Sequence, residues 1–178
     1  MKQTPVIILL CACLIAAALS SCKAPQKAEP GLPQSVATAA NPAAEQAQGH
    51  YQVFLRLWQN ESALRDDIQY LALNPEGCKL ADTEPLIALL QRFCDDNGLK
   101  FLQGDFESLA ARGFINKAEL SWKDGVIVSF ADRSLSAKRL VTEASMWRSG
   151  AGAVGIQYTA TRSGGDWNVT REKMLWIS

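Results

Sequence analysis

The sequence has only one histidine, and this scarcity excludes whole classes of catalytic site. Among its 178 residues, His50 alone could supply an imidazole. Ser-His-Asp and Cys-His sites use that group as general base, and zinc sites with several histidine ligands need more than one. We therefore expect no catalytic triad, no metal site and no bound cofactor. His50 lies where a predicted linker meets the first predicted helix, so we expect it to be solvated.

The sequence also lacks an excess of charge of either sign. Lysine and arginine together number 18, and aspartate and glutamate together also number 18. A domain that binds duplex nucleic acid needs a basic face to displace counterions from the phosphates. We therefore expect no nucleic-acid partner.

The N-terminal apolar run, from Val6 to Leu19, is too short to cross a membrane as a helix, because a hydrocarbon core of ~30 Å takes about 20 residues to span. With Lys2 before it, the run is typical of a signal peptide. It ends at Leu19-Ser20-Ser21-Cys22, which resembles the processing site of bacterial lipoproteins. The resemblance implies that residues 1–21 are removed and that Cys22 carries lipid. An ordinary secretory signal with an incidental cysteine is the alternative.

Lys23 follows the cysteine at the position where the lipoprotein family uses aspartate to favour retention in the inner membrane. The resemblance therefore implies a protein anchored in the outer membrane on its periplasmic face, and an inner-membrane or plasma-membrane lipoprotein is the alternative. Residues 22–49 hold the lipidated cysteine and a linker rich in alanine, glutamine and proline, which cannot bury enough apolar surface to become ordered. Residues 43–48 could instead extend the following helix backwards.

The cysteines suggest a disulfide. Cys11 and Cys13 leave with the signal and Cys22 carries lipid, so Cys78 and Cys94 remain as a pair in an oxidising compartment. The bridge requires the chain after Cys78 to run back alongside the next helix. A reduced buried pair and a reactive thiol are the alternatives.

Residues 50–178 are expected to form one domain that begins with helices. Apolar residues from Phe54 to Leu71 recur at helical spacing. A second helix is predicted from Asp82 or Thr83 to Asn97-Gly98, and a third over 105–112 with Gly113 as its left-handed stop. A short strand is predicted over 99–102.

From Ala118 onward the apolar period changes to two, which predicts strands. A hairpin is expected over 118–130, with Gly125 left-handed in a three-residue loop. Further strands are expected near 137–148, 153–162 and 167–177, the last with a bend near 171–173.

The predicted fold class is α+β, with N-terminal helices packed on a curved four-stranded antiparallel meander. This order, with a Gly165-Asp166-Trp167 hairpin leading into a long last strand, resembles the NTF2-like or cystatin-like α+β roll. Residues 150–155 match the G-x-G-x-x-G dinucleotide fingerprint. They join two predicted antiparallel strands rather than a strand and a helix, so we interpret them as a hairpin turn.

Four residues on the predicted strands are candidates for a pocket or a binding surface. Glu143 is expected to share a face with Trp147, and Glu172 with Trp176. Our first hypothesis is an envelope lipoprotein whose non-catalytic periplasmic domain binds a partner protein or a small apolar ligand. The alternative is an NTF2-like enzyme that uses Glu143 or Glu172 as general base.

Overall fold

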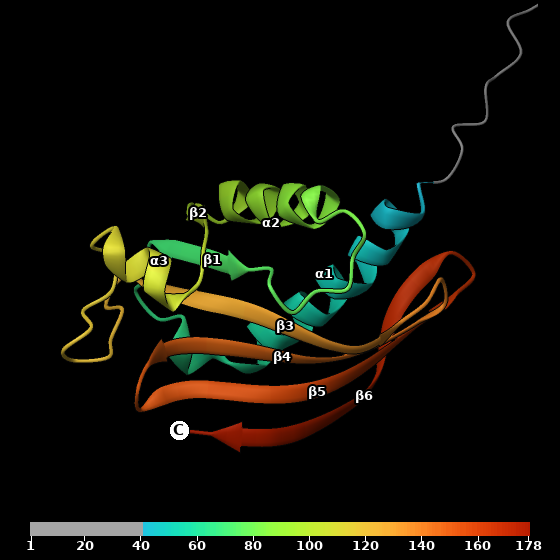
Figure 1. The fold of residues 1–178 in the computed structure, drawn as a ribbon. Helices are drawn as coiled ribbons and strands as arrows, with labels where there is room; N and C mark the ends of the chain where they lie inside the picture. The colour runs from blue at the N-terminus through green and yellow to red at the C-terminus, as the bar shows by residue number, and fades with distance from the viewer. Residues whose placement is uncertain (1–40) are drawn as a thin grey trace, which may run out of the picture. The chain divides into compact units, whose positions relative to one another are not determined.

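A six-stranded mixed sheet with helices on both faces forms the part of the chain that the computed structural model describes, residues 41–178 (Figure 1). The strand order is β2-β1-β3-β4-β5-β6. The predicted signal peptide, Cys22 and the linker up to residue 40 lie outside the described residues. Within residues 41–178, no helix is both long and apolar enough to span a membrane.

Helix α1 (Pro42–Asn60) begins earlier and ends earlier than predicted. Asn41 caps it by accepting a hydrogen bond from the Ala43 backbone N–H at 3.0 Å, and Pro42 occupies the first turn, where its missing N–H is harmless. Residues 42–49 therefore belong to α1 rather than to the linker, which confirms the alternative that residues 43–48 extend the helix backwards. The predicted continuation to Leu71 is wrong, because a 3₁₀ turn (Ser62–Leu64) follows and Leu71 lies in a strand.

That strand, β1 (Tyr70–Asn74), was missed because it shows no alternation. Leu71, Ala72 and Leu73 are all fully buried, since both faces of β1 are covered. β1 pairs in parallel with β2 (Lys100–Gln103) on one side and with β3 (Gly125–Leu135) on the other. The sheet therefore has more strands than the four predicted, and it is not wholly antiparallel.

The remaining two helices agree with the prediction. Helix α2 (Glu84–Asp96) connects β1 to β2, with Pro85 in its first turn. Helix α3 (Phe106–Ala111) starts after Asp105, whose side chain accepts a hydrogen bond from the Ser108 N–H at 2.7 Å. Gly113 follows it in the left-handed region with φ of 81°.

The predicted hairpin over 118–130 is wrong. Trp122 is buried, but Leu120 is 51% exposed and adopts a positive φ, so the segment before Gly125 is a loop. Gly125 is not left-handed; it begins β3, which pairs with β1 instead of a preceding hairpin strand. The apolar alternation at 118–122 was misleading because only Trp122 reaches the core.

The predicted antiparallel meander is confirmed in part. β3, β4 (Arg139–Ser149), β5 (Gly152–Ser163) and β6 (Asp166–Ile177) form a meander. Residues 150–155 turn into β5, as the sequence predicts. β6 carries two register shifts, which leave Thr170 and Leu175 without partners on β5 and flank the predicted bend.

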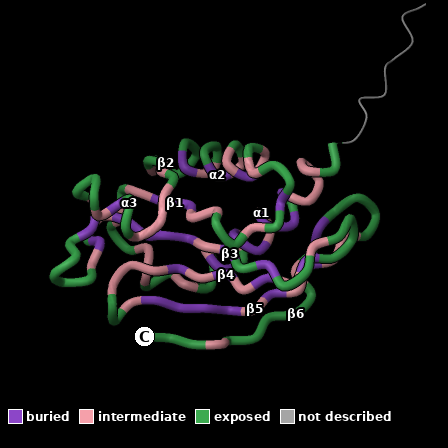
Figure 2. The backbone as a smooth tube through the Cα atoms, viewed as in Figure 1, coloured by how far each residue is buried: buried purple, intermediate pink, exposed green. Residues whose placement is uncertain are grey.

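Helices α1 and α2 pack on one face of the sheet over the main core, which contains Phe54, Leu90 and Tyr158 (Figure 2). On the opposite face, α3 and the loop that carries Trp122 cover β1 and β3. We call the remainder of that second face, over β4 to β6, the open face.

The predicted disulfide is not formed in the structure, where Cys78 and Cys94 are both free thiols. The Asp132 backbone N–H donates to the Gly77 carbonyl at 3.0 Å and the Lys79 N–H donates to the Asp132 carboxylate at 2.8 Å, so the connector follows β3 instead of running back along α2. Burial raises the pKa of both thiols to about 12, so neither is a reactive nucleophile near neutral pH. The cysteines therefore give no support to an oxidising compartment.

Candidate functional site

The structure brings two of the four predicted site residues together. The Trp176 indole N–H donates to Glu143 Oε1 at 2.9 Å, and the indole ring lies over Gly155, where any side chain would overlap it. Both residues lie on the open face, where Glu143 lines a hollow of about 310 Å³ together with Ser129, Ala131 and Ser145.

The other two predicted residues lie elsewhere. Trp147 shares the face of Glu143, as predicted, but its ring packs edge-on against Phe106 of α3 with centroids 5.1 Å apart. The prediction that Glu172 shares a face with Trp176 is wrong. Leu175 is an extra residue between them, so Glu172 lies opposite Tyr158 on the α1 side while Trp176 lies opposite Gly155. Asn60 at the end of α1 donates to Glu172 Oε2 at 3.4 Å.

A second hollow surface lies between α1 and β6. Three adjoining hollows of about 390, 170 and 220 Å³ share lining residues and follow the same seam. We call this surface the α1–β6 groove. Its lining residues are Gln48, Gln52, Leu55, Arg56 and Gln59 from α1, and 165–172 from β6 and the turn before it.

One wall of the groove is the free edge of β6. Among residues 41–178, β6 is the last strand in the sheet, and no other strand of that part pairs with its outer edge. Successive residues of a strand point to opposite faces, so a hollow that contacts four consecutive residues contacts the edge of the strand rather than one face. Val169 to Glu172 line one hollow in this way. The groove therefore borders the outer edge of β6.

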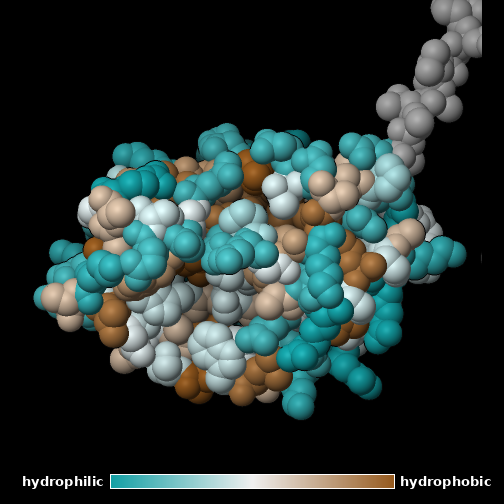
Figure 3. All heavy atoms as spheres, viewed as in Figure 1, coloured by the Kyte–Doolittle hydropathy of each residue, from teal (hydrophilic) through white to brown (hydrophobic). Residues whose placement is uncertain are grey.

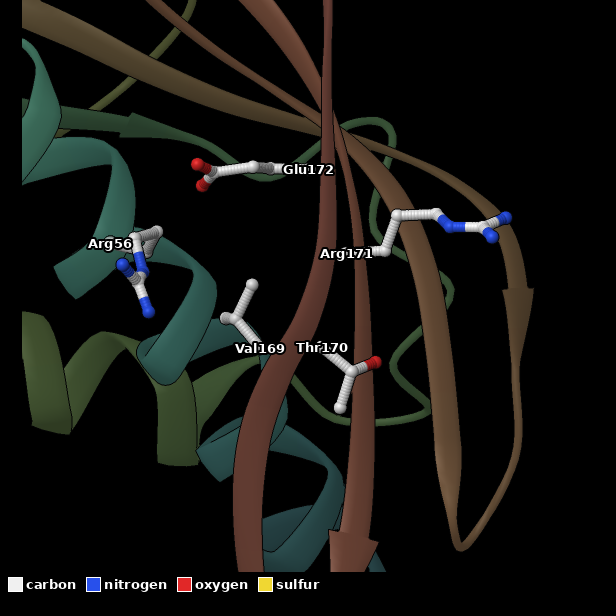
Figure 4. Close-up of a pocket in the computed structure, with 5 residues that line it drawn as sticks. All are labelled: Arg56, Val169, Thr170, Arg171 and Glu172. Atoms are coloured by element: carbon white, nitrogen blue, oxygen red, sulfur yellow. The ribbon is translucent and has the colours of Figure 1, made fainter.

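The other wall is a polar ridge of α1. Gln48, Gln52 and Arg56 follow one another at intervals of four residues, which places them on one helix face. In Figure 4, Arg56 and Glu172 point into the space between α1 and β6, together with Val169, while Arg171 points away toward the opposite side. Trp167 forms part of the floor of the groove and is 5% exposed. Its ring packs so closely against Gly49 that a Cβ atom at that position would lie 3.1 Å from the ring.

A buried charged pair fixes α1 to the sheet. His50 Nε2 lies 3.0 and 2.9 Å from the two Asp132 carboxylate oxygens, and His50 Nδ1 lies 3.2 Å from the Gln46 carbonyl. Both ring nitrogens thus lie within hydrogen-bonding distance of oxygen acceptors. The expectation that His50 is solvated is wrong.

Asp132 is held in its charged form by the same contacts. Burial alone would raise the pKa of its carboxyl, but the hydrogen bond and charge of His50, with the Lys79 N–H, lower that pKa below its ordinary value. Both side chains of the pair are 0% exposed, so neither can touch a substrate. The pair therefore holds α1, β3 and the connector after β1 together.

The sequence contained a signal for this pair. Asp132 continues the buried phase of Val126, Val128 and Phe130, and His50 continues the buried helical phase of Phe54. A charged residue in a buried phase needs an opposite charge. Sequence reasoning missed the pair because the helix was started too late to include His50.

One further finding concerns metal binding. Within the described part of the chain, no cluster of three or more histidine, cysteine, aspartate or glutamate side chains could hold a metal ion.

No protein-family model matches the chain, and no curated protein or solved structure matches it either, so the groove is interpreted from its own residues.

Proposed function

We propose that this chain is a lipid-anchored envelope protein whose domain binds another protein by accepting an extended segment beside β6. Cys22 anchors it in the outer membrane, facing the periplasm. The observation that carries the binding role is the outer edge of β6, which lines the α1–β6 groove over residues 166–172 and has no partner strand among residues 41–178.

Strand addition would use the backbone N–H and C=O groups along the outer edge of β6. A peptide that pairs with a sheet edge gains main-chain hydrogen bonds, and its alternate side chains contact the two walls. β6 is 12 residues long, and edge strands are normally blunted by proline, charged residues or bulges. The half of β6 that lines the groove contains no proline or lysine, and it carries one register shift, at Thr170, and the charged residues Asp166, Arg171 and Glu172. The glutamine side chains of α1 supply both donors and acceptors above the added strand.

The groove suits a polypeptide better than a small apolar ligand, because glutamine, arginine, asparagine and threonine dominate its lining. The enzyme alternative gains no support from the geometry. Glu143 is engaged by Trp176, while Glu172 is exposed on the other side of the sheet. The NTF2-like or cystatin-like assignment stays a prediction.

The anchor is tested by replacing Cys22. The Cys22→Ala chain should incorporate no radiolabelled palmitate and should accumulate as an unprocessed precursor, because no other residue accepts the lipid. Cys78→Ala serves as the control and should label like the wild type. Equal labelling of the Cys22→Ala chain would rule out the lipoprotein assignment.

The groove is tested by photocrosslinking in intact cells. A photoreactive amino acid at Gln52 or Asn168 should give adducts with one defined protein, because both positions line the groove. The same amino acid at Arg92, whose side chain is 83% exposed on α2, is the control. If the groove positions yield no adduct beyond those at the control, the groove is not a protein-binding site.

A further inference from the structure

The charges of β6 restrict what can pair with its edge. The centre of the strand reads Arg171-Glu172-Lys173, and all three residues are exposed. Arg171 and Lys173 lie opposite Thr159 and Gln157 on the open face, whereas Glu172 lies opposite Tyr158 on the α1 side. An added strand would therefore meet two cations on one of its faces.

The charges of β6 disfavour three of the registers in which a second copy of this chain could pair with the edge. In a two-fold antiparallel pairing, directly opposite residues lie on the same face of the joined sheet. A pairing centred on Glu172 places Glu172 opposite itself and Arg171 opposite Lys173. A pairing centred on either cation places that cation opposite itself. Each of these registers sets like charges against each other, which destabilises a strand pair.

We propose that the occupant of the α1–β6 groove is an extended segment of a different protein, with acidic residues at alternate positions. This inference rests on the proposed function and names the chemistry of the partner. Acidic side chains two residues apart point to the same face of a strand, so both can meet Arg171 and Lys173. Opposite charges across the edge also select the register of the added strand and accelerate its encounter.

The opposite face of the added strand meets the wall formed by α1. There the glutamines at positions 48, 52 and 59 lie beside Arg56 and Glu172, one charge of each sign. This face therefore selects small or uncharged polar side chains rather than a net charge. The preferred pattern is acidic residues that alternate with uncharged ones.

A capped peptide tests this chemistry directly. The probe is fluorescein-labelled Ser-Thr-Glu-Val-Glu-Val-Thr-Ser, and the matched probe has lysine in place of both glutamates. Binding to the purified full-length chain in detergent is measured by fluorescence anisotropy. The acidic probe should bind at least ten times more tightly than the lysine probe, and its affinity should fall as salt is added.

Charge reversal in the protein should invert this preference. Arg171→Glu/Lys173→Glu should weaken binding of the acidic probe at least tenfold and strengthen binding of the lysine probe. Both residues are exposed, so the variant should fold normally. Arg92→Glu/Lys123→Glu, which reverses two exposed charges away from β6, should leave both affinities unchanged.

Three outcomes would overturn the inference. One is equal affinity for the two probes, and another is an acidic-probe affinity that the β6 charge reversal does not change. The third is sedimentation of the full chain as a dimer that the β6 charge reversal dissociates. The proposed function fails separately, through loss of the crosslinks at Gln52 and Asn168, so a groove that crosslinks but ignores the acidic probe has a partner of other chemistry.

Discussion

The Asp132→Ala variant is expected to lose about 3 to 5 kcal/mol of unfolding free energy, because breaking the buried pair leaves the His50 ring without its carboxylate partner. Asp132 also accepts the Lys79 backbone N–H, so the substitution removes a hydrogen bond that fixes the connector between β1 and α2. Urea denaturation monitored by circular dichroism measures the loss.

The Glu45 to Arg162 ion pair provides the matched control. It also joins α1 to the sheet, but its side chains are 31% and 24% exposed. Glu45→Ala should therefore lose only about 0 to 1 kcal/mol. If Asp132→Ala is no more destabilising than Glu45→Ala, the buried pair does not hold α1 in place.

A double-mutant cycle separates the pair from its surroundings. The His50→Leu/Asp132→Leu chain should be less destabilised than the sum of its two single variants, because it buries no unpaired charge. Additive losses would show that His50 and Asp132 contribute independently.

The contribution of Asp132 should disappear in acid. Its folded-state pKa is lowered relative to the ordinary value of about 3.9 in an unfolded chain. The stabilisation is therefore complete above about pH 4 and is lost as the pH falls through the folded-state pKa. The difference in stability between wild type and Asp132→Ala should therefore narrow as the pH falls below about 4. A constant difference over that range would contradict the assigned pKa direction.

The second large effect is expected at Trp167, where Trp167→Ala should lose about 3 to 5 kcal/mol of unfolding free energy. The side chain is 5% exposed and packs against Gly49 of α1 and into the main core. Its removal leaves a cavity under the groove, so binding of the acidic probe should weaken together with stability.

Trp167→Phe distinguishes packing from hydrogen bonding at this position. The Trp167 indole N–H has no hydrogen-bond partner within residues 41–178, so phenylalanine removes no hydrogen bond and keeps most of the ring contact. It should lose less than half as much stability as Trp167→Ala. Ile177→Ala, at a side chain that is 73% exposed, should change stability by no more than about 0.5 kcal/mol. Equal losses for Trp167→Phe and Trp167→Ala would show that packing is not the cause.

Local sequence determined the elements whose signals lie within a few residues. Pro85 at the start of α2, and Asp105 and Gly113 around α3, act through their own backbone preferences, so the helix bounds were predictable. The alternation of β4 and β5 was equally local, because one face of each strand meets the core. The signal peptide and Cys22 also follow from sequence alone, and they stay predictions.

Only the tertiary structure decided the identity of β1, the burial of His50 and the position of the groove. β1 shows no periodicity because both of its faces are covered, and His50 is buried because Asp132 meets it from β3. The extra Leu175 moves Trp176 to the face opposite Glu172, which separates two residues that the sequence grouped. The groove lies between α1 and the last strand. No local sequence pattern predicts such contacts, because burial and strand pairing depend on which distant segment packs beside a given residue.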